Sequence, residues 1–234
     1  MRTIILLIVY VVLVLVAGLP ILFFSFLTHR PEPLLALGKF AMRISPAVLG
    51  LRLKVFGRES IDPHKNYVFM ANHLSFLDGP LLFLVIPQPV RVILKREIFR
   101  IPFVGIGMKM VDFVPVDRRG VKGGKKAIQK AAQLMKERGY SFLIFPEGTR
   151  SRTGEMQAFR RGGFFLALES GAPIVPITVK GTFELMPRGS FFCRPGQIEV
   201  IFHPPVSTKG YTPENMPELI ELVRKKILTG LEHK

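Results

Sequence analysis

The feature that most constrains this chain is a long uncharged stretch near its start. No charged residue occurs between Thr3 and Thr28, and residues 4–19 are mostly Ile, Leu and Val. At a rise of about 1.5 Å per residue, a helix of this length can cross a hydrocarbon core about 30 Å thick. The run is long and lacks a clear small-x-small cleavage site, which argues against a removable signal peptide. We therefore expect a membrane-attached segment ahead of a folded domain.

A second helical pattern covers residues 34–51, after Pro31 and Pro33. Its apolar residues recur on one helix face with basic residues among them, which suits an amphipathic helix in the membrane interface. Basic residues behind the first apolar run outnumber the single Arg2 ahead of it, so the positive-inside rule places the domain on the cytoplasmic side of the cell (inner) membrane. These residues are Arg30, Lys39, Arg43, Arg52 and Lys54. The sequence leaves open whether the first helix spans the bilayer or dips into one leaflet, and whether it bends at Pro20.

Size and charge narrow the class of protein. With 234 residues, the chain has room for one full-sized domain and a short appendage. Its formal net charge of +16 indicates anionic partners such as lipid headgroups, acidic carrier proteins or nucleic acid. A hydrophobic content of 48% favours a membrane-associated chain over a nucleic-acid-binding domain. The single Cys193 excludes an intramolecular disulfide and fits a reducing compartment.

Apolar, β-branched runs alternate with helical patterns along the rest of the chain. Amphipathic helices are predicted at residues 124–138 and 213–231. This alternation is typical of an α/β fold, here a single mixed, largely parallel sheet flanked by helices. We expect residues 1–54 to form a membrane segment of two helices and residues 55–234 to form one α/β domain. Strands are predicted at residues 51–56, 67–70, 90–94, 111–116, 141–145, 174–179 and 198–202.

The first polar cluster follows the strand predicted at residues 67–70 and reads Asn72-His73-Leu74-Ser75-Phe76-Leu77-Asp78. If a helix begins near Ser75, the Asp78 carboxylate can hold one imidazole nitrogen of His73 and leave the other as a general base. This is the base and orienting acid of a serine-protease triad without its serine, so a substrate hydroxyl would be the nucleophile. The alternative is a loop histidine beside an aspartate that caps the next helix.

The second polar cluster follows the strand predicted at residues 141–145 and reads Phe145-Pro146-Glu147-Gly148-Thr149-Arg150. Pro and Gly favour a tight turn, and exposed backbone N–H groups beside Arg150 make a site for an anionic oxygen. A solvated loop is the alternative. Neither cluster decides the function by itself.

Four blocks in order resemble the glycerolipid acyltransferase family. They are Asn72-His73-x4-Asp78 (an HX4D motif), Val114-Pro115-Val116-Asp117-Arg118, Phe145-Pro146-Glu147-Gly148-Thr149-Arg150 and Val175-Pro176-Ile177. The resemblance covers roughly residues 50 to 205, and the short membrane-attached N-terminus is also typical of the family. Within the family, the chain is most similar to the bacterial-type 1-acyl-sn-glycerol-3-phosphate (lysophosphatidic acid) acyltransferases.

The resemblance implies a role for each matching residue. His73 would deprotonate the acceptor hydroxyl, and Asp78 would orient it. Substrate-binding roles fall on Lys95, Arg118, Glu147, Gly148, Thr149 and Arg150. Pro115 departs from an uninterrupted strand, which leaves Arg119 as an alternative to Arg118. The Val175-Pro176-Ile177 block is associated with structural or acyl-chain roles, and N–H groups near Gly148 or Thr149 are candidate oxyanion donors.

The implied reaction moves a fatty acyl group from an acyl-carrier-protein or coenzyme A thioester to the sn-2 hydroxyl of lysophosphatidic acid and yields phosphatidic acid. The thioester is a cosubstrate, and we expect no bound cofactor, no metal site and no nucleic-acid partner. Membrane lipids and the acyl carrier are the expected partners, and the sequence does not indicate an oligomeric state. Alternatives are another lysophospholipid acceptor or a non-catalytic membrane lipid-binding protein. The other histidines, among them His203, read as surface or loop residues.

Overall fold

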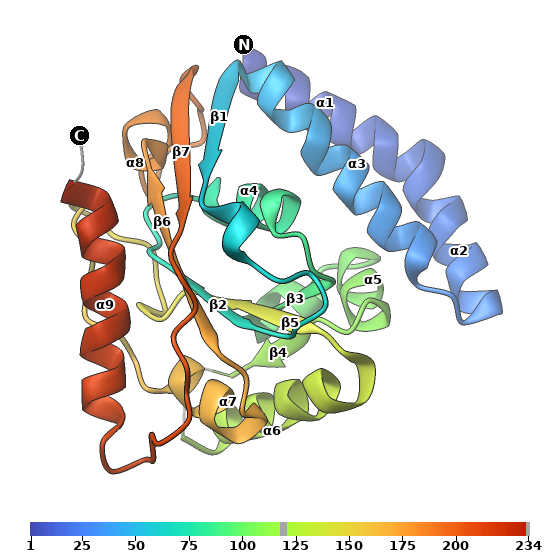
Figure 1. The fold of residues 1–234 in the computed structure, drawn as a ribbon. Helices are drawn as coiled ribbons and strands as arrows, with labels where there is room; N and C mark the ends of the chain where they lie inside the picture. Colours follow the sequence, from blue (N-terminus) through green and yellow to red (C-terminus); the bar gives the residue numbers. More distant parts are fainter. Residues whose placement is uncertain (118–120, 233–234) are drawn as a thin grey trace.

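Seven strands form one mixed sheet at the centre of the computed structural model (Figure 1). The structure describes residues 1–117 and 121–232. The strand order is β1-β7-β6-β2-β5-β3-β4. The strands are β1 (Leu51–Phe56), β2 (Val68–Ala71), β3 (Val90–Lys95), β4 (Val114–Val116), β5 (Ser141–Ile144), β6 (Ile174–Lys180) and β7 (Gly196–Phe202).

The direction of the strands brings several chain segments to one edge of the sheet. β6, β2, β5, β3 and β4 run parallel to one another, while β7 is antiparallel to β6 and parallel to β1. The carboxyl ends of five strands therefore lie at the same edge as the starts of β1 and β7, and we call this the carboxyl edge. The prediction of a single mixed, largely parallel sheet is confirmed.

One predicted strand is shorter in the structure. The run at residues 111–116 forms a strand only at β4, because helix α5 (Val104–Met110) ends just ahead of it. Asp112 has a φ of 61°, which is incompatible with extended backbone. Pro115 lies on β4 at the outer edge of the sheet, where a missing backbone N–H is tolerated.

Helices cover both faces of the sheet (Figure 1). α4 (Asp78–Val85) packs on one face, which also receives Leu6 and Leu49 from the N-terminal helices. The other face carries α6 (Val121–Arg138), α7 (Gly162–Ser170) and α9 (Met216–Glu232). The sequence predicted α6 and α9 but missed α7. Short helices complete the domain: η2 (Arg58–Ser60), η3 (Arg96–Arg100) and α8 (Thr182–Leu185).

The N-terminal segment is a hairpin of two long helices. α1 (Arg2–Leu13), the π-helical turn η1 (Val14–Gly18) and α2 (Leu19–Thr28) form one continuous helix of 27 residues, and its most hydrophobic 18-residue stretch has a mean hydropathy of 3.1. The widened turn precedes Pro20, which lacks an N–H and whose ring crowds the preceding turn. α3 (Glu32–Leu49) returns along α1, and the Tyr10 hydroxyl lies 2.5 Å from Ser45 Oγ. The expected boundary between residues 54 and 55 falls inside β1.

The open end of this hairpin adjoins the sheet, and its turn points away from it. Arg2 Nη1 donates to the Leu49 carbonyl at 3.3 Å, so the start of α1 adjoins the end of α3 and the start of β1 (Figure 1). The turn between α2 and α3 lies at the far end, away from the sheet. The flank ahead of the apolar helix is therefore next to the domain, and a charge count on its two flanks does not separate two sides of a membrane.

Candidate active site

The two polar clusters meet because their strands are neighbours. β2 and β5 pair in parallel with Met70 opposite Ile144, so the segments that follow them leave the carboxyl edge side by side. A backbone hydrogen bond of 2.9 Å from Ser151 N to the His73 carbonyl joins them just beyond the strands. The sequence placed both clusters at strand ends but could not show that these strands are adjacent.

Asp78 holds the imidazole of His73. Asp78 Oδ2 lies 2.9 Å from His73 Nδ1 and also accepts from the backbone N–H groups of Leu74 at 2.7 Å and Ser75 at 2.8 Å. Asp78 is fully buried, at the first residue of α4. Its carboxylate bonds to residues ahead of it, and α4 has no side-chain cap. The structure therefore does not support the reading of Asp78 as a helix cap.

The imidazole is fixed from several directions. Phe145 stacks on it with ring centroids 3.9 Å apart and an interplanar angle of 17°. The His73 backbone N–H donates to Glu147 Oε1 at 2.7 Å. With Nδ1 directed at Asp78, Nε2 makes no hydrogen bond within the described residues, and 19% of the side-chain surface is exposed. This nitrogen is placed to exchange a proton with a ligand.

Glu147 links the loop that carries His73 to the segment after the Phe145-Pro146-Glu147-Gly148 turn. Its Oε1 accepts from His73 N, and its Oε2 accepts from Gln157 N at 2.9 Å. Burial raises the pKa of the Glu147 carboxyl, although these two hydrogen bonds oppose the shift. Because both oxygens accept from backbone N–H groups, the carboxylate holds the His73 and Gln157 segments together and so shapes the site.

Gly148 and Thr149 complete the turn. Gly148 has a φ of 73°, and a Cβ at this position would lie 2.9 Å from the Arg160 side chain, so glycine is required. Its N–H donates to the Phe145 carbonyl at 3.0 Å, which makes it an unsuitable oxyanion donor. The Thr149 carbonyl accepts from Gln157 Nε2 at 3.2 Å.

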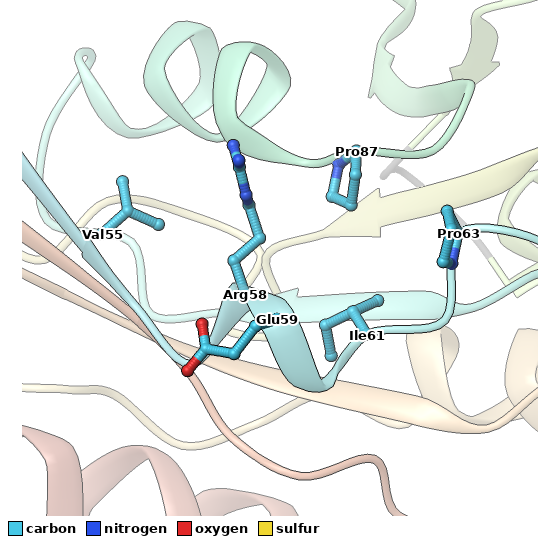
Figure 2. A pocket seen from close by; sticks show the side chains of 6 residues that line it. All are labelled: Val55, Arg58, Glu59, Ile61, Pro63 and Pro87. Carbon is cyan, nitrogen blue, oxygen red and sulfur yellow. The ribbon is translucent and has the colours of Figure 1, made fainter.

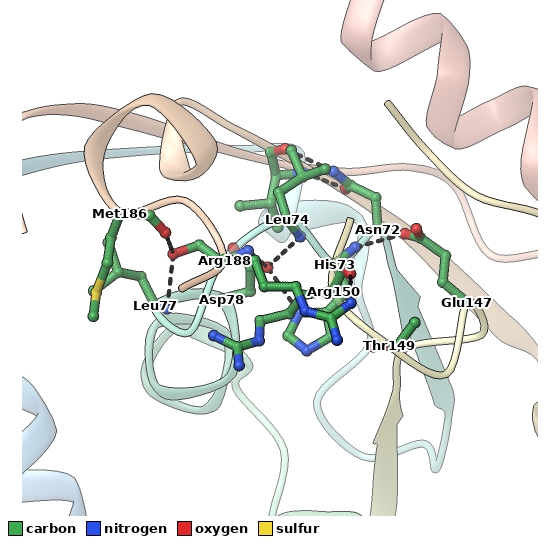
Figure 3. Close-up of polar contacts among 12 residues, drawn as sticks. Asn72, His73, Leu74, Leu77, Asp78, Glu147, Thr149, Arg150, Met186 and Arg188 are labelled. Atoms are coloured by element: carbon green, nitrogen blue, oxygen red, sulfur yellow. Dashed lines mark hydrogen bonds and ion pairs between the residues drawn. The ribbon is translucent and has the colours of Figure 1, made fainter. Parts of the chain in front are cut away.

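Cationic side chains surround the open side of the imidazole. Arg150 lies next to Ser151, and its guanidinium is 5.8 Å from the centre of the Phe76 ring. Arg188, which the sequence analysis missed, donates from Nη1 to the Arg150 carbonyl at 3.0 Å. Figure 3 shows both guanidinium groups on the same side of the site as the imidazole. Arg188 belongs to no recognised block, and only the tertiary structure brings it here.

Of the remaining predicted phosphate ligands, the structure describes Lys95, which lies farther along the carboxyl edge. Lys95 is the last residue of β3, which lies two strands from β2 in the sheet. Its Nζ lies 3.3 Å from Glu97 Oε1. Asp117 follows β4 and lies 3.9 Å from Arg96. Arg118 and Arg119 lie outside the described residues, so the choice between them stays open.

The fourth block is part of the sheet core. Val175, Pro176 and Ile177 lie on β6 opposite β2, and all are buried. Asn72 extends this pairing, since its side chain accepts from Val179 N at 2.8 Å and donates to the Val179 carbonyl at 2.9 Å. β6 therefore supports the strand that leads into His73.

A separate hollow lies away from these groups. It is lined by Val55, Arg58, Glu59, Ile61, Pro63 and Pro87 (Figure 2). Val55 lies near the end of β1, and the other residues follow β1 or precede β2 and β3, which places the hollow at the edge opposite His73.

Comparisons with known proteins identify the class that this fold and site define. The acyltransferase family model matches residues 52–180, more than half of the chain, so the protein belongs to the acyltransferase family. Its recognised relatives are the 1-acyl-sn-glycerol-3-phosphate acyltransferases, including bacterial ones. The protein of that name from Borreliella burgdorferi is 31% identical over 82% of this chain and 76% of its own length.

Two further relatives agree with this assignment. The mouse 1-acyl-sn-glycerol-3-phosphate acyltransferase alpha is 33% identical over 77% of this chain, which spans 64% of the mouse protein. The crystal structure of the 1-acyl-sn-glycerophosphate acyltransferase from Thermotoga maritima matches with a TM-score of 0.83 and 28% identity. That match covers 99% of this chain and 93% of the other, so the N-terminal hairpin is part of the shared fold.

Proposed function

We propose that this protein transfers a fatty acyl group from a thioester donor to the sn-2 hydroxyl of lysophosphatidic acid and produces phosphatidic acid. The observation that carries the proposal is the pairing of a fixed imidazole, His73 on buried Asp78, with guanidinium groups on its open side. A base beside phosphate ligands suits an acceptor that carries both a hydroxyl and a phosphate. The names of the relatives support the same reaction.

The mechanism follows from the contacts of His73. Nε2 takes the proton of the acceptor hydroxyl while its oxygen attacks the thioester carbonyl carbon. Asp78 stabilises the imidazolium that forms, because its Oδ2 faces Nδ1 at 2.9 Å. Collapse of the tetrahedral intermediate breaks the C–S bond, and the imidazolium returns the proton to the leaving thiolate. The phenyl ring of Phe145 keeps the imidazole in plane for both transfers.

The acceptor phosphate would be held by cations at the carboxyl edge. Arg150 and Arg188 are the nearest candidates, and guanidinium groups bind phosphate oxygens in pairs. Lys95, at the same edge, and Arg118 are proposed as further ligands. Glu147, Gly148 and Thr149 would act by shaping the turn that presents Arg150.

The N-terminal hairpin supports attachment to a membrane. Its apolar helix is long enough to cross a bilayer, and only 6% of its most hydrophobic stretch is buried in the protein. We place the protein at the cell (inner) membrane with the catalytic domain on the cytoplasmic side, in keeping with its single cysteine. Membrane lipids and acyl-carrier protein or acyl-coenzyme A are the proposed partners. The thioester serves as cosubstrate, and the proposed chemistry uses no bound cofactor.

The decisive experiment measures thiol release by the purified protein in detergent. The acceptors are a panel of lysophospholipids with and without a bare phosphate, and each is offered with carrier-protein and coenzyme A thioesters. We expect turnover with lysophosphatidic acid, and we expect His73→Ala to abolish it. His64→Ala is the matched control, because His64 is exposed and lies in the loop ahead of β2.

Each alternative function gives its own result in this assay. Turnover only with another lysophospholipid would retain the chemistry and reassign the acceptor. Binding of lysolipid without thiol release, equal in wild type and His73→Ala, would identify a non-catalytic lipid-binding protein.

A further inference from the structure

The loop between α8 and β7, residues 186–195, carries two exposed aromatic side chains. Phe191 is 82% exposed and Phe192 is 60% exposed. The loop has a defined internal structure, since Ser190 N donates to the Pro187 carbonyl at 3.0 Å and Ser190 Oγ donates to the Phe192 carbonyl at 2.9 Å. Two neighbouring phenyl rings held outward by an ordered turn are costly in water.

Hydrogen bonds tie this loop to the candidate active site at one end. Ser75 Oγ, inside the HX4D segment, donates to the Met186 carbonyl at 2.7 Å. Arg188 donates to the carbonyl of Arg150 at 3.0 Å. The loop therefore lies at the carboxyl edge, beside the mouth of the site.

The other end of the loop contacts the apolar hairpin. Cys193 N donates to Thr3 Oγ1 at 3.0 Å, at the start of α1. Gly196 N donates to the Gly50 carbonyl at 3.2 Å, just beyond α3. The segment that carries the exposed phenyl rings thus adjoins the start of α1, where Ile4, Ile5 and Leu7 are each 46–57% exposed.

Charge on the loop fits a lipid surface. Arg188 and Arg194 flank the aromatic pair, and both are exposed. Phenyl rings with flanking guanidinium groups are suited to the boundary between headgroups and acyl chains, where the rings enter the apolar layer and the cations meet phosphates. A second copy of this chain would bring the same cations together, so charge disfavours it as the occupant.

We propose that residues 186–195 form a second membrane contact, in which Phe191 and Phe192 insert into the acyl-chain region next to the active site. The hairpin and the adjoining loop would together hold the carboxyl edge against the bilayer. An acceptor lipid could then reach His73 with its phosphate still at headgroup level. The proposal rests on the membrane attachment of the hairpin and goes beyond the acyl-transfer reaction.

The chain contains no tryptophan, so a single tryptophan is a clean reporter. Phe191→Trp and Phe192→Trp are each reconstituted, as the full-length protein, into vesicles of phosphatidylcholine and phosphatidylglycerol. Their emission is compared between ordinary lipids and lipids with brominated acyl chains. We expect a blue-shifted emission and a severalfold loss of intensity with brominated lipids. Size-exclusion elution and the thermal transition of each variant check that it is folded.

Two matched reporters make the result decisive. Phe24→Trp reports on the hairpin, where Phe24 is 50% exposed, and Leu222→Trp reports on α9, where Leu222 is 37% exposed. Quenching at positions 191 and 24 but not at 222 supports the proposal. Quenching at 24 alone overturns the second contact, and quenching at none overturns the attachment of the hairpin as well. Shielding that depends on protein concentration, without quenching, would identify a second copy and also overturn it.

Discussion

At the scale of single residues, Asp78 concentrates its contacts on one oxygen. Oδ2 accepts hydrogen bonds from two backbone N–H groups and faces the imidazole of His73, whereas Oδ1 has no hydrogen-bond partner within the described residues. A buried carboxylate is tolerated only when such hydrogen bonds offset its desolvation. The same contacts fix the direction of the imidazole, so Asp78 is both a folding and an orienting residue.

Asp78→Asn should separate these two roles. An amide oxygen can keep the bonds from Leu74 N and Ser75 N but gives weaker stabilisation to the imidazolium. We expect kcat to fall by about 10³- to 10⁴-fold with little change in KM, in line with the loss of an orienting carboxylate elsewhere. Steady-state thiol release measures this effect, and a kcat close to that of wild type would show that Asp78 serves the fold alone.

Arg188→Ala tests the arginine that the motifs did not reveal. Loss of one charge-assisted hydrogen bond to phosphate, about 1.5–3 kcal/mol, should lower kcat/KM for lysophosphatidic acid by roughly ten- to a hundredfold. The loss should be smaller for an acceptor whose phosphate carries a neutralising headgroup. Arg224→Ala on α9 is the control, and equal losses for both acceptors would mean that Arg188 only supports the loop.

His203 provides a prediction on pH. Its Nε2 lies 2.8 Å from Thr178 Oγ1, which itself donates to the Ile227 carbonyl of α9. His203 lies in the loop after β7, as expected, and is half-buried there. Burial, with a smaller contribution from nearby Lys226, lowers its pKa below the ordinary value. The unfolded chain thus binds the proton more readily. This contribution to stability is complete above about pH 6.5 and is lost as the pH falls toward the folded pKa.

His203→Gln keeps a donor at this position and cannot titrate. We expect the thermal transition of wild type to fall more steeply than that of the variant as the pH drops below about 6.5. Melting curves across this range measure the difference, and parallel curves would contradict the prediction.

At the scale of elements, α9 packs against strand β6 at a glycine, Gly230. A Cβ at Gly230 would lie 2.3 Å from Thr178 Oγ1 and 2.8 Å from Thr178 Cβ, both on β6. The helix therefore approaches the sheet more closely than any side chain would allow. A contact of this kind is specific for the fold and invisible in the amphipathic pattern of the helix.

Gly230→Ala should destabilise the protein by about 1–3 kcal/mol through overpacking, despite the better helix propensity of alanine. Gly124→Ala on α6 is the matched control, because nothing lies within 4 Å of its added Cβ. That change should stabilise the protein by up to about 1 kcal/mol. Denaturant or thermal unfolding of both variants measures the contrast, and equal effects would contradict the close approach.

Most helices and strands were predictable from the sequence, whereas the way they pack against one another was not. The spacing of apolar residues predicts the strands and the helices α6 and α9. Helix α7 was missed, because its nine residues begin with Gly162 and Gly163 and follow a basic run. The site was predictable as two motifs. The position of Arg188 was not predictable, because it depends on the hydrogen bond from Ser75 to Met186, which holds a loop distant in sequence beside the site.

At the scale of the whole molecule, charge and apolar surface act together. In the proposed membrane attachment, the formal net charge of +16 attracts the chain to anionic bilayers, and the hairpin supplies apolar area. We expect Lys and Arg residues on the rim of the site to serve both this long-range attraction and the proposed binding of substrate. Salt distinguishes the two, since long-range attraction is screened first.

We expect turnover on vesicles rich in anionic lipid to fall as salt is raised from about 0.1 M to 1 M, where the screening length shrinks from about 10 Å to 3 Å. Turnover on neutral vesicles that contain the same acceptor should fall less. Thiol release in both vesicle types measures the ratio. A ratio independent of salt would show that the net charge has no part in membrane attraction.

The pairing of β1 with β7 sets the order in which this protein can assemble. Leu51 lies opposite Gly196, so the first strand finds its only described neighbour in the last strand of the sheet. A ribosome delivers the apolar hairpin well before β7 exists, and the sheet cannot close until β7 has been synthesised. With the membrane attachment proposed above, we expect the hairpin to reach the bilayer before the sheet is complete and the domain to fold while tethered there. A nascent chain arrested before β7 would expose the edge of β1 and would be prone to aggregate at the membrane.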